Sequence, residues 1–208
     1  MALTDLTFTA LKQSVANFLA KSNLISIIPD LVYMAELRLF RRLDLLAMED
    51  SETGTLTAGT ATLALPTGYR RTLAFYVSSS STNYPIKVVS PDEMFRSSLA
   101  VDTGQPRLMA VIGSTLTFAP TPDSDYTYVH HFAGSLDHLQ DATGGTNWLL
   151  TNAPDVYLYA TLVEAEAYLK NDPRISVWRE YAEEALKDLR VEDEAKRWRG
   201  GPLVPRAA

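Results

Sequence analysis

The sequence predicts an α+β fold in which helices at both ends of the chain flank a central region of strands. Two changes in hydrophobic periodicity support this prediction. In residues 1–46 and again in residues 148–197, apolar side chains recur every three or four positions, which is the spacing of amphipathic helices. Residues 47–147 instead show short alternating stretches rich in threonine, broken by glycine and proline, which is typical of strands joined by turns.

Two helices are expected before residue 46. Thr7 is placed to cap the first helix, and Ser22-Asn23 separates it from the second, which begins near Pro29. The second helix carries a wide apolar face, which has to be buried against other helices. The apolar positions are Phe8, Leu11, Val15, Phe18 and Leu19 in the first helix, and Ile28, Val32, Ala35, Leu39 and Leu43, widened by Tyr33, Leu37 and Phe40, in the second.

The central region is expected to contain a succession of short strands and one small helix. Residues 53–57 and 60–65 predict a hairpin that turns at Ala58-Gly59. A capping box, Ser90-Pro91-Asp92-Glu93, predicts the small helix. Further strands are expected at 73–77, 86–89, 107–112, 115–119 and 126–132, with a serine-rich loop at 78–83.

Two more helices are expected after Trp148. The first begins at 152–155 and the second carries Glu183 and Lys187, which are spaced to pair on its outer face. Neither pair of terminal helices has enough partners by itself, so the simplest packing joins the two pairs. We therefore expect a discontinuous helical domain of residues 1–46 and 148–197, an antiparallel β domain with one short helix at 47–147, and an extended C-terminal arm at 198–208.

Composition and charge exclude several classes of protein. The chain has no cysteine, which excludes a disulfide scaffold, thiolate zinc sites and cysteine nucleophiles. Its formal net charge is −6 although residues 196–208 are basic, so the body is acidic and ill suited to wrapping DNA tightly. No apolar run is long enough to predict a membrane span.

Residue types that carry chemistry occur in weak patterns. His130 and His131 point to opposite faces of a strand, and His138 near Asp137 and Asp141 fits a solvated turn as well as a metal cluster. Asp123 and Asp125 have the spacing of a calcium loop but lack its remaining ligands, and Gly144-Gly145 lacks the lysine of a phosphate loop. The acids Glu49, Asp50 and Glu52 could act as paired carboxylates only if one of them lay in an apolar pocket. We assign no catalytic, cofactor-binding or metal-binding residue and predict that the protein is not an enzyme.

The C-terminal arm has an unusual composition. Two glycines and two prolines prevent it from forming a helix or a central strand, while a few apolar residues are set among arginines. Three interpretations are open: a frayed terminus, a segment that orders when it docks on a partner, or a direct DNA contact.

Five segments, taken in order along nearly the whole chain, point to one family. They are residues 28–43 (IPDLVYMAELRLFRRL), 63–69 (LALPTGY), 104–107 with 116–120 (GQPR and LTFAP), 146–159 (TNWLLTNAPDVYLY) and 199–203 (RGGPL). In this order they resemble the head-to-tail adaptor (connector) proteins of tailed bacteriophages, including the tail tubular protein A type of short-tailed phages.

This resemblance implies a structural role in the virion, at the head-tail junction, after assembly in the host cytoplasm. It implies a homo-oligomeric ring, typically of twelve subunits, between the portal protein and a downstream tail or nozzle protein. Genomic DNA would pass through the lumen during ejection without sequence-specific binding, and no cofactor or membrane would be involved. The resemblance further implies a portal-docking arm whose contacts are Arg197, Trp198, Arg199, Leu203, Val204, Pro205 and Arg206.

Two alternatives remain open. A virion-associated cell-wall hydrolase would need a carboxyl group whose pKa is raised in a cleft. A glycan-binding or nucleic-acid-binding module could be built on the strands.

Overall fold

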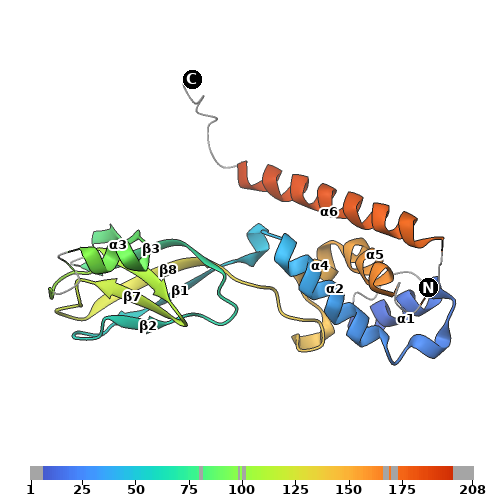
Figure 1. Cartoon of the computed structure of the whole chain (residues 1–208), viewed down its shortest axis with the longest axis horizontal. Coiled ribbons are helices and arrows are strands. Elements are labelled where there is room, and N and C mark those ends of the chain that lie inside the picture. Colours follow the sequence, from blue (N-terminus) through green and yellow to red (C-terminus); the bar gives the residue numbers. More distant parts are fainter. Residues whose placement is uncertain are drawn as a thin grey trace, which may run out of the picture. The chain divides into compact units, whose positions relative to one another are not determined.

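The computed structural model describes residues 7–79, 82–97, 99, 102–165, 169 and 173–198 (Figure 1). The predicted α+β fold is confirmed, because helices at both ends of the chain flank two four-stranded sheets in its middle. The chain divides into a helical unit of residues 1–47 and 136–208 and a β unit of residues 48–135. Residues 136–147, which the sequence pattern had placed with the strands, thus group with the helices.

Helix α5 (Pro154–Glu164) lies at the centre of the helical unit (Figure 1). It contacts the other four helices, which are α1 (Phe8–Leu19), α2 (Ile28–Arg42), α4 (Trp148–Asn152) and α6 (Ile175–Trp198). Short 3-10 turns lie at Ser22–Leu24, Leu46–Met48 and Thr143–Gly145. The N-terminal and C-terminal helices therefore share one core, as the sequence predicts.

The ends and faces of these helices follow from local sequence. The Thr7 hydroxyl accepts a hydrogen bond from the Ala10 amide at 3.3 Å, so the predicted cap of α1 is confirmed. The predicted apolar residues of α1 and α2 are buried or half-buried, with the exception of Phe18 and Tyr33. The predicted pair of Glu183 with Lys187 is wrong: both carboxylate oxygens of Glu183 instead accept hydrogen bonds from Arg42 of α2.

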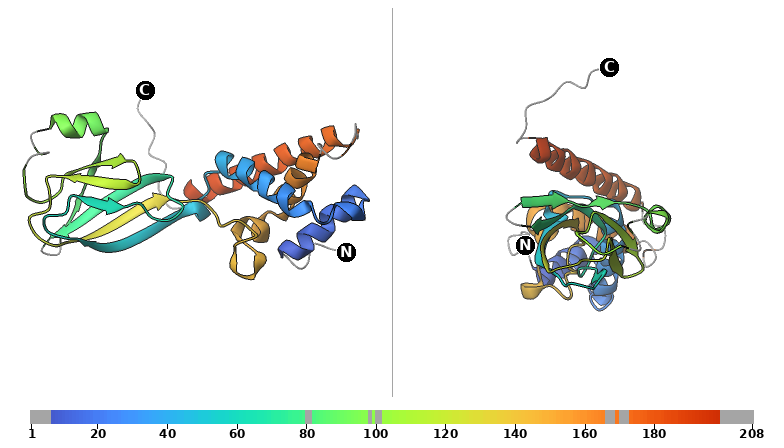
Figure 2. Two further views of the ribbon diagram at one scale, coloured as in Figure 1. Left: turned by 60° about the horizontal axis from the view of Figure 1, so that its bottom comes forward. Right: turned by 90° about the vertical axis from the view of Figure 1, so that its left-hand side faces the viewer.

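The β unit contains two sheets (Figure 2). The strands of the first sheet are ordered β1 (Glu49–Leu56), β8 (Tyr126–Ala133), β3 (Arg71–Ser79) and β4 (Thr82–Pro85). Those of the second are ordered β2 (Thr62–Ala64), β7 (Thr115–Ala119), β6 (Leu108–Ile112) and β5 (Lys87–Val88). The strands predicted at 107–112 and 115–119 are confirmed as β6 and β7, which pair antiparallel.

The hairpin predicted for residues 53–65 is wrong, because β1 and β2 belong to different sheets. β1 pairs with β8 and β2 pairs with β7. The segment between them bonds to the turn before β8: the Ala58 amide donates to Asp125 at 2.9 Å, and the Gly59 amide donates to the Pro122 carbonyl at 2.8 Å. The prediction of a loop at 78–83 is also wrong at its two ends, because Ser78 and Ser79 of β3 pair with Asn83 and Thr82 of β4. Residues 80 and 81 lie outside the described residues.

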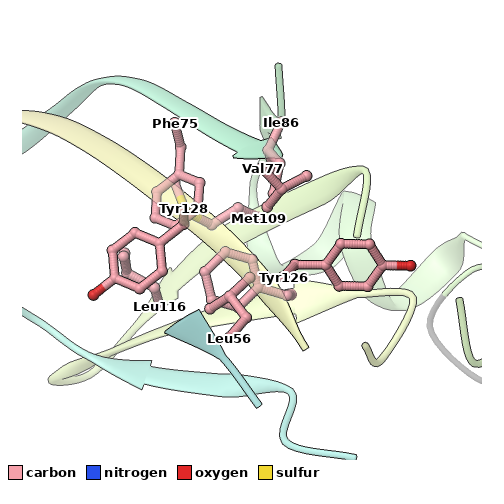
Figure 3. Packing of buried hydrophobic residues seen from close by; sticks show 9 residues of the cluster. Leu56, Phe75, Val77, Ile86, Met109, Leu116, Tyr126 and Tyr128 are labelled. Carbon is pink, nitrogen blue, oxygen red and sulfur yellow. The ribbon is translucent and has the colours of Figure 1, made fainter. Parts of the chain in front are cut away.

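Side chains from both sheets meet in one apolar core (Figure 3). Phe75 of β3 lies between Phe118 of β7 and Tyr128 of β8, with ring centroids 5.1 and 5.2 Å away. The other buried members of this cluster are Leu56, Val77, Ile86, Met109, Leu116 and Tyr126. The two sheets therefore pack face to face as a sandwich.

The β domain was predicted to be antiparallel, but it contains one parallel pair of strands, which a short helix connects. β5 and β6 run parallel, and parallel neighbours need a crossover connection. Helix α3 (Pro91–Arg96) lies in that connection, and the Ser90 hydroxyl caps it by accepting from the Glu93 amide, as predicted. Met94 covers the face of the second sheet that points away from the core cluster, against Ala110 and Ala119.

Gly54 gives a test of the cross-strand packing. It lies opposite Tyr128 in the ladder, and a β-carbon at this position would lie 2.7 Å from the Tyr128 hydroxyl oxygen. We expect Gly54→Ala to destabilise the β unit by about 1–3 kcal/mol, because the tyrosine has to leave its core position. Amide hydrogen exchange of β1 and β8 would measure this loss. Thr55→Ala, on the exposed side of the same strand, is the control; equal protection in both variants would contradict the prediction.

Candidate interaction surfaces

The residues predicted to dock on a portal begin where α6 ends. Arg197 lies in the last turn of this helix, and Trp198 is its final residue. The Arg197 Nε donates to Asp193 Oδ2 at 3.0 Å, and a terminal nitrogen of the same guanidinium donates to the Asp44 carbonyl at 3.1 Å. The remaining predicted contacts, Arg199, Leu203, Val204, Pro205 and Arg206, lie outside the described residues.

A buried carboxylate fixes this end of α6 to the chain segment that follows α2. Asp193 is only 5% exposed, and its Oδ1 accepts a hydrogen bond from the Leu46 amide at 2.9 Å. One turn earlier, Arg190 donates to the Arg42 carbonyl at 2.8 Å. This end of α6 is therefore anchored to residues 42–46. Sequence reasoning did not single out Asp193, although its four-residue spacing from Arg197 was visible.

A second buried carboxylate organises residues 137–147. Glu36 of α2 is 1% exposed, and its Oε1 accepts from the Leu139 amide at 2.8 Å and from the Tyr157 hydroxyl at 3.0 Å. Its Oε2 lies 2.8 Å from His138 Nδ1. Three partners from the loop and from α5 thus converge on one carboxylate, which explains why this loop belongs to the helical unit.

Asn147 extends the same network. Its amide nitrogen donates to the Tyr157 hydroxyl and to the Asp137 carbonyl, both at 2.8 Å, while its Oδ1 caps α4 by accepting from the Leu150 amide. Burial and the nearby Glu36 carboxylate raise the pKa of Tyr157 well above its usual value, so the hydroxyl stays protonated and donates to Glu36. The network positions the loop.

The histidines are not brought together. His130 is buried in the β unit and His131 is exposed on the opposite face of the same strand, as predicted. The His138 side chain contacts Glu36, while its carbonyl accepts a hydrogen bond from the Asp141 amide at 2.9 Å. Among the described residues, no three metal-binding side chains are grouped so that they could hold an ion.

The acidic residues that could have suggested catalysis have structural partners. Asp123 accepts from the Tyr126 hydroxyl at 2.7 Å, and Asp125 accepts from the Ala58 amide. Glu52 accepts from the Tyr128 hydroxyl at 3.1 Å, and burial with this carboxylate raises the pKa of Tyr128 to about 12. Gly144 and Gly145 form a 3-10 turn in the loop before α4.

Exposed apolar side chains are the remaining feature. In the helical unit they lie mainly on α2 and α6, and in the β unit on α3 and on strands β3, β4 and β5. They are Phe18, Ile25, Tyr33, Met34, Val177, Tyr181 and Val191 in the helical unit, and Leu73, Tyr84, Val88 and Phe95 in the β unit. Where exposed apolar groups gather on one surface, they can mark contacts with other proteins.

Comparison with known proteins identifies the family to which the chain belongs. The sequence model of a family described as SU10 adaptor protein matches residues 6–206, and the chain therefore belongs to the SU10 adaptor protein family. This is a family of phage adaptors, which implies a structural, non-enzymatic protein that binds other virion proteins. A comparison with curated proteins finds no match.

The family match confirms the predicted resemblance at the level of a phage adaptor. Similarity to the tail tubular protein A type stays a prediction. In the described part of the chain, no helix is both long and apolar enough to span a membrane.

Proposed function

We propose that this protein forms the adaptor ring that joins the portal of a phage head to the tail. The ring is a homo-oligomer, typically of twelve subunits, and it continues the channel through which DNA leaves the capsid. One of its faces contacts the portal and another contacts a downstream tail or nozzle protein at the head-tail junction of the virion. The match of residues 6–206 to a phage adaptor family carries this proposal.

The charge of the chain supports a channel that DNA crosses without being held. The 25 acidic residues outnumber the 19 basic ones, and this net charge of −6 disfavours contacts with phosphates, which provide most non-specific affinity for DNA. Several arginines are also occupied within the fold: Arg42 pairs with Glu183, and Arg197 pairs with Asp193. DNA therefore passes through the lumen without sequence-specific binding.

The portal-docking arm is residues 198–208 together with its root at Arg197. The bonds of Asp193 and Arg197 to residues 44–46 hold this root in place, so Arg197 does not have to be ordered at the moment of binding. The proposed anchors are Trp198, Leu203, Val204 and Pro205, with Arg197, Arg199 and Arg206 as the charged contacts. An aromatic residue flanked by arginines is a frequent composition of binding hot spots.

Mass measurement on a portal tests the ring. Purified protein is mixed with the cognate portal ring, and native mass spectrometry measures the product. We expect the portal to gain a whole number of 23.0 kDa subunits, which also counts them. A portal that gains no mass from folded protein would overturn the proposed function.

Deletion of the arm should abolish portal loading. A chain that ends at Arg197 keeps the bonds of Asp193 and Arg197 to residues 44–46, so we expect an unchanged thermal midpoint but no mass gain on the portal. A full-length chain with Leu203→Ser and Val204→Ser separates the loss of apolar anchors from the loss of length. Loading by the shortened chain at the level of the full chain would contradict the docking role of the arm.

A further inference from the structure

Helix α2 carries a stripe of Met34, Leu37 and Arg41, of which Met34 and Arg41 are exposed and Leu37 is half-buried; we call it the open stripe. These positions are three and four residues apart and so lie on one side of the helix, away from the buried Ala35 and Leu39. Met34 is 53% exposed. Arg41 makes no hydrogen bond or ion pair with any residue that the structure describes, whereas the neighbouring Arg38 and Arg42 bond to α5 and α6.

Helix α6 carries a second stripe, with the spacing four, three, four and three. We define it as Val177, Tyr181, Glu184, Asp188 and Val191, all of which are exposed. The buried row of α6 includes Trp178, Ala182 and Leu189, and the flank that carries Glu183 and Arg190 bonds to α2. The α6 stripe lies away from this flank, so the α2 helix of the same chain does not cover it.

The acids of the α6 stripe lack cations. Glu184 and Asp188 are four residues apart, a spacing at which like charges repel. Neither forms a hydrogen bond or ion pair within the described ranges. A cation placed between them from outside would remove this repulsion, and the apolar Tyr181 and Val191 on both sides of the pair would exclude water from the contact.

The two stripes match in charge and in spacing. Met34 and Arg41 are seven residues apart, as are Tyr181 and Asp188, and seven residues of helix span about 10 Å. Val191 and Glu184 have the same separation in the opposite direction along α6. Whichever way the helices run, Met34 and Leu37 meet an apolar side chain when Arg41 meets a carboxylate.

We propose that the open stripe of α2 in one copy of this chain docks on the α6 stripe of the next copy. Two different surfaces of the same chain then meet, and such head-to-tail contacts generate a ring when the rotation from one copy to the next closes. This inference rests on the proposed adaptor ring and names its subunit interface. The occupant is a second copy because the chain carries both complementary stripes and cannot bring its own two together.

Charge reversal tests the pairing. Arg41→Glu, and separately Glu184→Lys with Asp188→Lys, each place like charges across the contact. We expect either variant alone to load onto a portal with an affinity reduced roughly tenfold or more. Since the altered groups are exposed and unpaired within the described chain, the variants should fold normally. Lys21→Glu, which makes the same change of charge as Arg41→Glu elsewhere on the helical unit, is the control for that variant.

Rescue makes the result specific. An equimolar mixture of the two variants should load like the wild type, because the reversed charges attract wherever the variants alternate around the ring. A single chain that carries all three reversals should load as well. Reversal variants that load as well as the wild type, or a mixture that is no better than its components, would overturn this interface. Failure of the wild-type chain to load would instead overturn the proposed function on which it rests.

Cross-linking gives a second readout. The chain has no cysteine, so introduced thiols are the only reactive ones. Met34→Cys combined with Val177→Cys or with Val191→Cys, treated with a flexible bismaleimide in the loaded complex, should give a ladder of covalent multimers. The pair that reacts faster reports the direction in which the helices run. Loaded complexes that give no ladder with either pair would contradict the proposal.

Discussion

Replacing Glu36 by leucine is expected to lower the free energy of unfolding of the helical unit by about 3–5 kcal/mol. The carboxylate is 1% exposed and is bonded by the Leu139 amide, the Tyr157 hydroxyl and His138. Its removal leaves these polar groups without a partner in an apolar surrounding, and each such group carries a desolvation cost.

Glu36→Gln separates the lost hydrogen bonds from the lost charge. The amide oxygen of glutamine can still accept from the Leu139 amide and the Tyr157 hydroxyl, and its nitrogen can donate to a neutral His138. We therefore expect the free energy of unfolding to fall by only about 1 kcal/mol in this variant, which is the typical net contribution of one hydrogen bond. Asp30→Leu, an exposed acid on the same helix, is the control for the change of side chain.

Tryptophan fluorescence during urea unfolding measures this loss in the helical unit alone. All three tryptophans of the chain, Trp148, Trp178 and Trp198, belong to that unit. A transition of Glu36→Leu that coincides with that of the wild type would show that the network is not a major source of stability.

The β unit is expected to lose about 3 kcal/mol of stability as the pH falls from 6.5 to 4, because His130 has to accept a proton in the core. Burial, with a smaller effect of His131, lowers the pKa of His130 from 6.5 to about 4. Its Nε2 lies 3.0 Å from the Thr72 hydroxyl, while its Nδ1 is buried without a partner in the described part of the chain. A second N–H would therefore have no acceptor.

The sign of this effect follows from proton binding. Between pH 4 and 6.5 the unfolded chain binds a proton at His130 and the folded chain does not, so acid favours unfolding. The stabilisation is complete above pH 6.5, is lost through this window and does not change further below it. Hydrogen exchange of β3 and β8 as a function of pH, read by mass spectrometry, measures it.

Two variants of β8 isolate the residue that is responsible. His130→Phe should remove the pH dependence, because phenylalanine fits among Phe75 and Phe132, whose rings each lie 5.1 Å from that of His130. His131→Gln, on the exposed face, should keep most of it. If wild type and His130→Phe follow the same pH profile, the titrating group lies elsewhere.

Local signals in the sequence were the most dependable. The caps at Thr7 and Ser90 were predicted because each side chain bonds an amide only three residues away. Strand partners were not, because alternation in 53–65 is the same whether β1 pairs with β2 or with β8, which lies some seventy residues further along. The parallel pairing of β5 likewise depends on a crossover that periodicity cannot show.

The candidate surfaces also differ in how far the sequence could predict them. The docking arm came from a resemblance, and most of its residues lie outside the described ranges. The α2 stripe was hidden because a wide apolar face predicts burial without saying which edge stays open; Tyr33 and Met34 are exposed while Val32 and Ala35 are buried. Buried Asp193 was missed since its partner, the Leu46 amide, is 147 residues away in sequence.

The division of the helical unit between the two ends of the chain sets an order for its synthesis. Residues 48–135 emerge from the ribosome as a complete unit, while α1 and α2 still lack α5 and α6. At roughly 5–20 residues per second, the apolar faces of α1 and α2 wait several seconds for their partners. A nascent adaptor therefore presents a finished sandwich beside two unpartnered helices, which is the stage at which a chaperone has the most apolar surface to bind.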